Sequence, residues 1–174
     1  GEVWSNTIIP SAYFTQNNIN APFKHNLQGV CDFPMTFAML DAVNQPVGWT
    51  TGVSKVYMTL SEDLLYKDPK RNCLFLDNHD LDRVFSVVGE DLAKWKIAMG
   101  LLLTERGIPQ VYYVGLLAGH NDMDLLARSA SDGLSQACHV HAQDRAGIEP
   151  ARRRLEDRWR GQQAQLGHAE PSAR

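Results

Sequence analysis

Acidic residues stand at the ends of three short apolar segments of this 174-residue chain, where their carboxylates could take part in chemistry. Carboxylates delivered from successive parallel strands converge on one pocket. Cleavage of a glycosidic bond needs such a set: one acid, one nucleophile and a charge that stabilises an oxocarbenium-like transition state. Acidic residues after strands also cap helices, so each of them has a structural interpretation as well. The residues concerned are Glu2, Asp32, Asp77 and Asp80.

The elements that would position these carboxylates alternate between strands and helices. Short apolar runs bounded by turn residues predict strands, and apolar residues at a spacing of three and four predict helices. Ser61 is a candidate N-cap, and Gly107 is a candidate helix terminator. The order predicts an α/β fold with a parallel sheet and right-handed crossovers. The predicted strands are 1–4, 27–33, 73–76 and 108–113, and the predicted helices are 35–43, 61–66 and 91–106.

The composition excludes several classes of function. The chain is 44% hydrophobic and 21% charged with a formal net charge of −3, which is typical of one globular domain or part of one. DNA, RNA and anionic membranes require a clustered positive surface, and this balance does not supply one. No apolar run approaches the roughly 20 residues that cross a bilayer. We therefore expect neither a nucleic-acid nor a membrane partner, and nothing indicates a compartment or an oligomeric state.

The cysteines and histidines do not form a recognisable metal or disulfide pattern. Cys31, Cys73 and Cys138 are widely spaced and contain no Cys-x-x-Cys pair, so we expect them to pack rather than to form a disulfide framework or a zinc knuckle. The stretches 120–124 and 138–141 bring His together with Asp or Cys. Each is open to interpretation as a metal site or as an exposed polar turn, and we favour the turn.

The composition changes in the middle of the chain. Residues 1–113 hold every Phe, every Tyr and all six Lys, whereas residues 114–174 hold eight of the eleven Arg. We therefore expect a domain boundary after residue 113, followed by an atypical Arg/Ala-rich tail over 114–174. Two interpretations of this tail stay open: out-of-frame or unrelated sequence without a fold, and a polar, partly helical extension.

Four motifs follow one another along residues 1–113. They are GEVW at 1–4, DFP at 32–34, FLDNHD at 75–80 and GIPQVYY at 107–113. In their order and spacing they resemble the alpha-amylase family of glycoside hydrolases, family 13, and within it the neopullulanase and cyclomaltodextrinase branch. The resemblance implies a partial (β/α)8 TIM barrel that comprises strands five to eight. Residues 1–113 would then be the C-terminal half of the catalytic barrel.

The resemblance implies roles for the polar residues of two motifs. Glu2 looks like the general acid/base of a retaining mechanism, beside which a solvated strand-end Glu is the structural alternative. Asp80 looks like a second carboxylate that stabilises the transition state. His79 looks like a group that binds sugar hydroxyls, although a His after a strand is often structural. Asn78 is interpreted as a brace for the loop.

Two further residues have competing interpretations. Trp4 is either an aromatic platform for a glucose ring or an ordinary packing residue of the barrel. Arg83 either reaches a hydroxyl of a more distant sugar or pairs with Asp77 or Asp82 in the loop. We include both Trp4 and Arg83 among the predicted substrate-binding residues.

The resemblance implies an enzyme that cleaves or transfers α-glucosidic bonds of starch-derived glucans or cyclodextrins, with an α-glucan oligosaccharide as its substrate. In the family the nucleophile is an Asp that precedes the GEVW segment, and no residue of this sequence corresponds to it. We therefore expect the chain as given to be inactive alone. The alternative is a non-catalytic, amylase-like carbohydrate-binding or subunit-partner module. No cofactor is expected; calcium occurs in the family, but no motif indicates it here.

Overall fold

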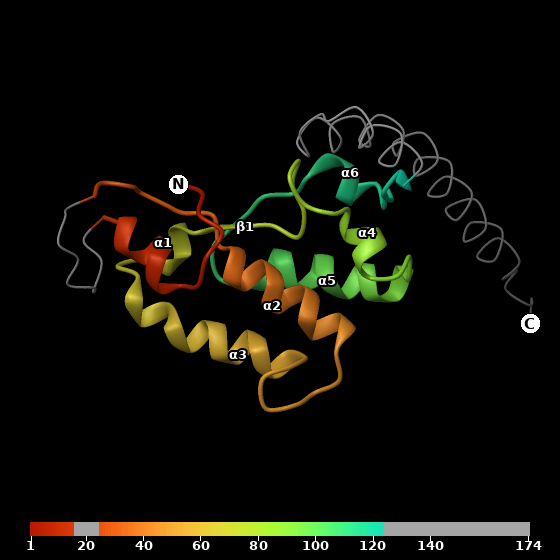
Figure 1. The fold of residues 1–174 in the computed structure, drawn as a ribbon, viewed down its shortest axis with the longest axis horizontal. Helices are drawn as coiled ribbons and strands as arrows, with labels where there is room; N and C mark the ends of the chain where they lie inside the picture. The colour runs from red at the N-terminus through yellow and green to blue at the C-terminus, as the bar shows by residue number, and fades with distance from the viewer. Residues whose placement is uncertain (16–24, 124–174) are drawn as a thin grey trace, which may run out of the picture.

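Helices pack around a short parallel sheet in the computed structural model, which describes residues 1–15 and 25–123 (Figure 1). Helices α2, α3 and α5 lie on one side of β1 (Figure 1). Within the described ranges, no helix is long and apolar enough to span a bilayer. In chain order the elements are α1 (Ile8–Tyr13), α2 (Phe33–Asn44), α3 (Val53–Ser61), η1 (Glu62–Leu65), η2 (Pro69–Arg71), β1 (Cys73–Leu74), α4 (Val84–Val87), α5 (Leu92–Thr104), β2 (Ile108–Pro109) and α6 (Tyr113–Leu116).

Parallel backbone pairing sets the order of four chain segments. β1 pairs with β2 through Cys73 opposite Ile108, and Cys31 forms a parallel bridge with Cys73 on the other side. Beyond Cys31, the N-terminal ammonium of Gly1 donates to the Gly29 carbonyl at 3.0 Å, and the Cys31 N–H donates to the Gly1 carbonyl at 2.8 Å. This alternation is the pattern of parallel pairing. The predicted parallel arrangement is confirmed, and all four segments point the same way.

The strands are shorter than the sequence predicts. Residues 1–4 pair through Gly1 but form no strand, and only Ile108–Pro109 of the predicted strand 108–113 forms β2. Strand β2 lies at the surface, because Ile108 is 56% exposed and, among the described residues, β2 pairs only with β1. Gly107 has a φ of 124°, and a Cβ there would collide with the Asn72 carbonyl, so glycine is needed to bring the chain into β2.

Helices α2 and α5 form where the sequence predicts them, because each begins at an Asp that caps it. Asp32 Oδ1 accepts from the Met35 N–H at 3.0 Å, and Asp91 Oδ1 accepts from the Ala93 N–H at 2.8 Å. These bonds satisfy donors that the first turn of a helix leaves unpaired. The two helices then bury their apolar faces in the main core, through Met35, Ala38, Met39, Ala98, Met99 and Leu102.

Helix α3 was missed by the sequence analysis, and the predicted helix 61–66 was wrong. Ser61 ends α3 rather than capping a new helix, and its hydroxyl donates back to the Met58 carbonyl at 2.6 Å. The following four residues form the 3₁₀ turn η1 instead. The physical reason is that α3 has no side-chain cap to mark its start and buries only Val56 and Thr59, so it is stabilised by packing against α2.

The chain stays packed beyond the expected domain boundary after residue 113. Val114 is fully buried in α6, and Ala118 belongs to the main hydrophobic core. The Trp95 indole N–H donates to the Gly115 carbonyl at 2.9 Å, which joins α5 to α6. The boundary therefore does not coincide with a break in the packing. The remainder of the predicted tail, 124–174, lies outside the described residues.

Cys31 and Cys73 are free, half-buried thiols on neighbouring segments. Burial, followed by the nearby charge of Glu2, raises the pKa of the Cys31 thiol. Burial likewise raises the pKa of the Cys73 thiol, which donates to Gln110 Oε1 at 2.9 Å. Both cysteines thus behave as packing residues, as the sequence predicts, while Cys138 lies outside the described residues.

A buried ionic network ties the segments that precede the two strands to the start of α2. Arg106 Nη1 donates to Asp32 Oδ2 at 2.7 Å, and its Nε donates to Asp63 Oδ2 at 2.7 Å. The Asn72 side-chain amide also donates to Asp32 Oδ2, at 3.2 Å. Burial lowers the pKa of the Arg106 guanidinium, but the hydrogen bond to Asp63 and the charge of Asp32 outweigh it and leave the pKa above its ordinary value.

Replacing Arg106 should destabilise the fold strongly. Arg106→Met keeps the aliphatic stem but leaves Asp32, which is 1% exposed, without its counter-charge. We expect the free energy of unfolding, measured by urea denaturation, to fall by about 3 kcal/mol, because an uncompensated buried charge is costly. Lys96→Met, at an exposed position of α5, is the control and should change it by less than about 0.5 kcal/mol. Equal losses for the two variants would contradict the role assigned to the network.

Candidate active site

Glu2 and Trp4 form a hydrogen-bonded pair at the first paired segment. The Trp4 indole N–H donates to Glu2 Oε1 at 3.2 Å, and both residues are exposed. The Trp4 ring packs on Phe33 with their centroids 4.7 Å apart, and Phe33 in turn contacts Phe75 edge-on at 4.9 Å. Trp4 remains 52% exposed. It therefore packs against the sheet and also presents indole surface to solvent, so the structure is compatible with both interpretations.

His79 and Asp80 form a second pair, on the loop that follows β1. His79 Nε2 lies 3.2 Å from Asp80 Oδ2, and both side chains are accessible to solvent. The buried Asn78 accepts the Asp80 N–H through its Oδ1 at 2.9 Å. This bond is an Asx turn that holds the loop in one conformation. The prediction that Asn78 braces the loop is confirmed.

Arg83 does not lie where a sugar contact requires it. Its side chain is 0% exposed, and the guanidinium donates to the carbonyls of Asn78, at 2.6 Å, and Leu81. The guanidinium carbon also lies 5.0 Å from the centre of the Tyr112 ring, in a cation–π contact. This geometry corrects the prediction that Arg83 is a substrate-binding residue. Backbone carbonyls of a tight loop need buried donors, and Arg83 supplies them from beneath.

Asn121 was missed by the sequence analysis, although it holds the same loop. Its Oδ1 accepts a hydrogen bond from the backbone N–H of Arg83 at 2.9 Å, and its Nδ2 donates to Asp82 Oδ1 at 2.8 Å. Its own backbone N–H donates to Ser86 Oγ at 2.8 Å. These contacts span more than 30 residues of sequence, and no local pattern around Asn121 indicates them.

Two of the four strand-end carboxylates serve the fold and not a shared pocket. Asp32 is 1% exposed, and its carboxylate accepts hydrogen bonds from the Met35 N–H, Asn72 and Arg106. Asp77 is 3% exposed, and its Oδ2 accepts the Val84 N–H at 3.0 Å at the start of α4. The expectation that all four carboxylates converge on one pocket was therefore wrong. Glu2 and Asp80 are the two that stay open to solvent.

The two open carboxylates share one edge of the sheet. Glu2 directly follows the segment paired with Cys31, and Asp80 lies in the loop after β1, which pairs with Cys31 on the other side. One intervening segment puts their strands about 10 Å apart. A pair of accessible carboxylates, an imidazole and an indole along one edge can protonate a leaving group, bind hydroxyls and stabilise positive charge.

Metal ligands are not grouped in the described part of the chain. No three His, Cys, Asp or Glu side chains within residues 1–15 and 25–123 are placed to hold a metal ion. His120, at the start of the first candidate stretch, instead places its Nδ1 3.0 Å from the Asn121 carbonyl. The stretch 138–141 lies outside the described residues.

Comparison with known proteins identifies the family. The sequence pattern of the family "Alpha amylase, catalytic domain" matches residues 1–171. A "Beta/alpha-amylase" of Paenibacillus polymyxa is 34% identical over 93 residues, which are 49% of this chain and 7% of that protein. A sucrose phosphorylase of Streptococcus mutans is 38% identical over 68 residues (39% of this chain, 14% of that protein). A cyclomaltodextrin glucanotransferase of Geobacillus stearothermophilus is 51% identical over 39 residues (22% and 5%).

Solved structures share the fold. The alpha-amylase of Geobacillus thermoleovorans, complexed with acarbose, superposes with a TM-score of 0.57 at 25% identity, over 70% of this chain and 26% of that chain. An alpha-amylase of Malbranchea cinnamomea gives a TM-score of 0.56 at 23% identity, over 84% and 30%, and shows the fold alone. The chain thus spans under a third of these structures and at most 14% of the three curated relatives. Because the family match runs through residues 1–171, the chain belongs to the alpha-amylase catalytic-domain family.

Proposed function

We propose that the chain contributes the general acid/base and a transition-state carboxylate to a retaining enzyme that hydrolyses or transfers α-glucosidic bonds. The observation that carries the proposal is the shared sheet edge, at which Glu2 and Asp80 are the two of the four strand-end carboxylates that stay accessible. The family match and relatives named as amylases, a glucanotransferase and a sucrose phosphorylase support an α-glucoside as the substrate. The nucleophile is then a carboxylate that the family carries upstream of GEVW.

Glu2 acts as the acid and then as the base. Its protonated carboxyl donates its proton to the glycosidic oxygen as the bond to the leaving sugar breaks. At the same time the nucleophile attacks the anomeric carbon and forms a covalent bond to it. Glu2 then deprotonates the water or acceptor sugar that attacks the covalent intermediate, which restores both carboxyl groups. Trp4, whose indole N–H bonds Glu2 Oε1, orients this carboxyl and offers an apolar surface to the leaving sugar.

Asp80 and His79 act on the sugar at which the charge develops. The positive charge of the oxocarbenium-like transition state is stabilised by the Asp80 carboxylate, and hydroxyls of the same ring bind both side chains. Their 3.2 Å contact keeps the two groups in one orientation, and the Asn78 turn fixes the backbone beneath them. A rigid loop suits this task because electrostatic stabilisation depends on groups that need not reorganise.

The finer assignment within the family rests on the motif pattern. We propose a neopullulanase or cyclomaltodextrinase type of enzyme, for which cyclodextrins as well as starch-derived glucans are substrates. Comparable kcat/KM values for a cyclodextrin and for a linear maltodextrin of equal length would support this assignment. A preference for the linear glucan of about 100-fold or more would contradict it while leaving the catalytic roles intact.

Glu2→Gln and Asp80→Asn should separate the two catalytic roles. In the protein that includes the nucleophile, we expect each variant to lower kcat on maltodextrin by about 1000-fold. An α-glucosyl fluoride needs no protonation of its leaving group. On this substrate the glycosylation step of Glu2→Gln should therefore recover by about 100-fold, measured as the burst of fluoride release. Asp80→Asn should not recover, because it acts on the charge of the ring.

Matched controls exclude general effects of the substitutions. Glu62→Gln in η1 and Asp68→Asn at the start of η2 change the same side chains away from the sheet edge and should leave kcat within about twofold. A loss below about tenfold in Glu2→Gln or Asp80→Asn would remove that residue from the site. Glucan binding without turnover in the unsubstituted protein that includes the nucleophile would favour the non-catalytic module instead.

Arg83 is a positioning residue for the loop that carries His79 and Asp80. Arg83→Met preserves most of the volume but leaves the carbonyls of Asn78 and Leu81 without their charged donor. We expect the free energy of unfolding to fall by about 3 kcal/mol and cleavage of the loop by thermolysin to accelerate. Lys70→Met, at an exposed position, is the control. Unchanged cleavage at the loop in Arg83→Met would refute the positioning role.

A further inference from the structure

Gly115 lies in α6, where the backbone itself does not require a glycine. Among the described residues, the glycines with a positive φ are Gly52, Gly89 and Gly107. What excludes a larger residue at this position is space. A Cβ on Gly115 would lie 2.6 Å from Oδ2 and 2.8 Å from Cγ of Asp77, and closer still to Oδ1. The Asp77 carboxylate therefore packs directly against the backbone of Gly115.

Hydrogen bonds hold both sides of this contact. The Gly115 carbonyl accepts the Trp95 indole N–H at 2.9 Å and the Ala118 N–H at 3.1 Å, so this part of α6 is tied to α5. Asp77 is 3% exposed, and its Oδ2 accepts the Val84 N–H at 3.0 Å. Because protein interiors are close-packed, a methyl group added between two held groups forces one of them to move.

The bond between Asp77 and Val84 closes the base of the loop 78–83, which carries His79 and Asp80. It joins the residue before the loop to the residue after it. Within the loop, the Asp80 N–H donates to the side chain of Asn78, the residue that follows Asp77. A displacement of Asp77 is therefore passed to Asp80 through this hydrogen-bonded turn.

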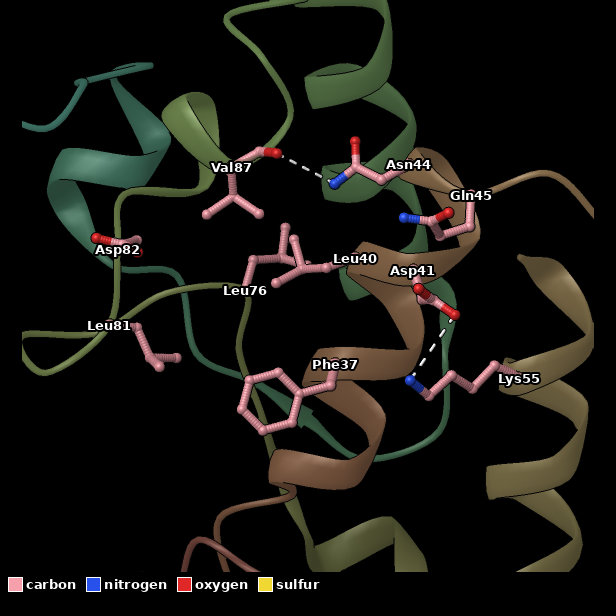
Figure 2. A pocket seen from close by; sticks show the side chains of 10 residues that line it. All are labelled: Phe37, Leu40, Asp41, Asn44, Gln45, Lys55, Leu76, Leu81, Asp82 and Val87. Atoms are coloured by element: carbon pink, nitrogen blue, oxygen red, sulfur yellow. Dashed lines mark hydrogen bonds and ion pairs between the residues drawn. The ribbon is translucent and has the colours of Figure 1, made fainter. Parts of the chain in front are cut away.

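One flank of the same loop borders open space. Leu81 and Asp82 line a cavity of about 430 Å³, and Figure 2 shows both of them at one side of it, across from Lys55. Groups that line a void lack partner atoms on that side. The loop thus has room to shift when its base is displaced, and its position depends on the contacts that hold the base.

We propose that Asp77 and Gly115 are positioning residues for Asp80. Asp77 fixes the base of the loop, and Gly115 is small enough to let the Asp77 carboxylate reach the Val84 N–H. The inference rests on the proposed function, in which Asp80 stabilises the positive charge of the transition state. Such stabilisation depends on groups that are already in place, and a displacement of about 1 Å is enough to lower a rate by about 100-fold.

Gly115→Ala tests this role in the protein that includes the nucleophile. We expect the added methyl group to lower kcat on maltodextrin by about 100-fold. On an α-glucosyl fluoride the loss should persist, as in Asp80→Asn and unlike in Glu2→Gln, because the fluoride replaces only the proton donor. The rate constant is measured in single turnovers at saturating enzyme, so an unfolded fraction of the variant does not change it.

Gly100→Ala is the matched control. Gly100 lies at an exposed position of α5, where a Cβ meets nothing within 4 Å. This substitution makes the same chemical change without a collision, and alanine favours the helix. We expect kcat to stay within about twofold of the parent.

A double-mutant cycle tests whether the two residues act through one contact. Asp77→Ala removes the carboxylate and its bond to Val84, and should itself lower kcat by about 100-fold. Adding Gly115→Ala should then lower kcat by less than about threefold more, because the methyl group has room. If Gly115→Ala alone does not fold, folding of the double variant supports the same contact. A double variant that also fails to fold would contradict it.

Hydrogen exchange separates this inference from the proposed function. The Val84 amide should exchange at least about tenfold faster in Gly115→Ala than in the parent, and at the parent rate in Gly100→Ala. An unchanged Val84 amide, multiplied losses in the cycle or recovery on the fluoride would each overturn the positioning role. Full activity in Asp80→Asn would instead refute the proposed function, while exchange at Val84 would still report whether Gly115 holds the base of the loop.

Discussion

The buried carboxylate of Asp32 joins three parts of the chain on which the sheet depends. One of its oxygens caps α2, and the other accepts from Asn72 and Arg106, which lie just before β1 and β2. A buried charge is tolerated only when its partners are all present. The start of α2 and the entries to both strands are therefore fixed relative to one another, and with them the edge at which the strands end.

The candidate site follows one physical rule: buried groups hold the backbone, and accessible groups are left for chemistry. Asn78 and Arg83 satisfy the loop from inside, while the loop presents His79 and Asp80 outward. At the neighbouring segment, Phe33 supports the ring of Trp4 in the same way. The proposed function depends on such a division, because it holds the accessible side chains in place without neutralising them.

The sequence predicts those features that have a local cause. Helices α2 and α5 carry an Asp cap followed by apolar residues at helical spacing, so both could be found. Helix α3 has no side-chain cap and buries few residues, and it is stabilised by packing against α2, which leaves no local mark in the sequence. The motif FLDNHD correctly indicates a strand that ends in a polar loop. It does not indicate that Arg83 is buried, because that depends on Tyr112 and Asn121, which are distant in sequence.

Asn121 also limits where this chain can be recombined with other members of its family. Its hydrogen bonds to Arg83, Asp82 and Ser86 make the loop after β1 and the segment after α6 one inseparable unit. A chimaera whose crossover point lies between these segments would combine the loop after β1 from one parent with the Asn121 segment from another. We therefore expect loops to be exchanged without loss of these hydrogen bonds only between parents that carry both Asn121 and its partners, or with crossovers placed beyond residue 121.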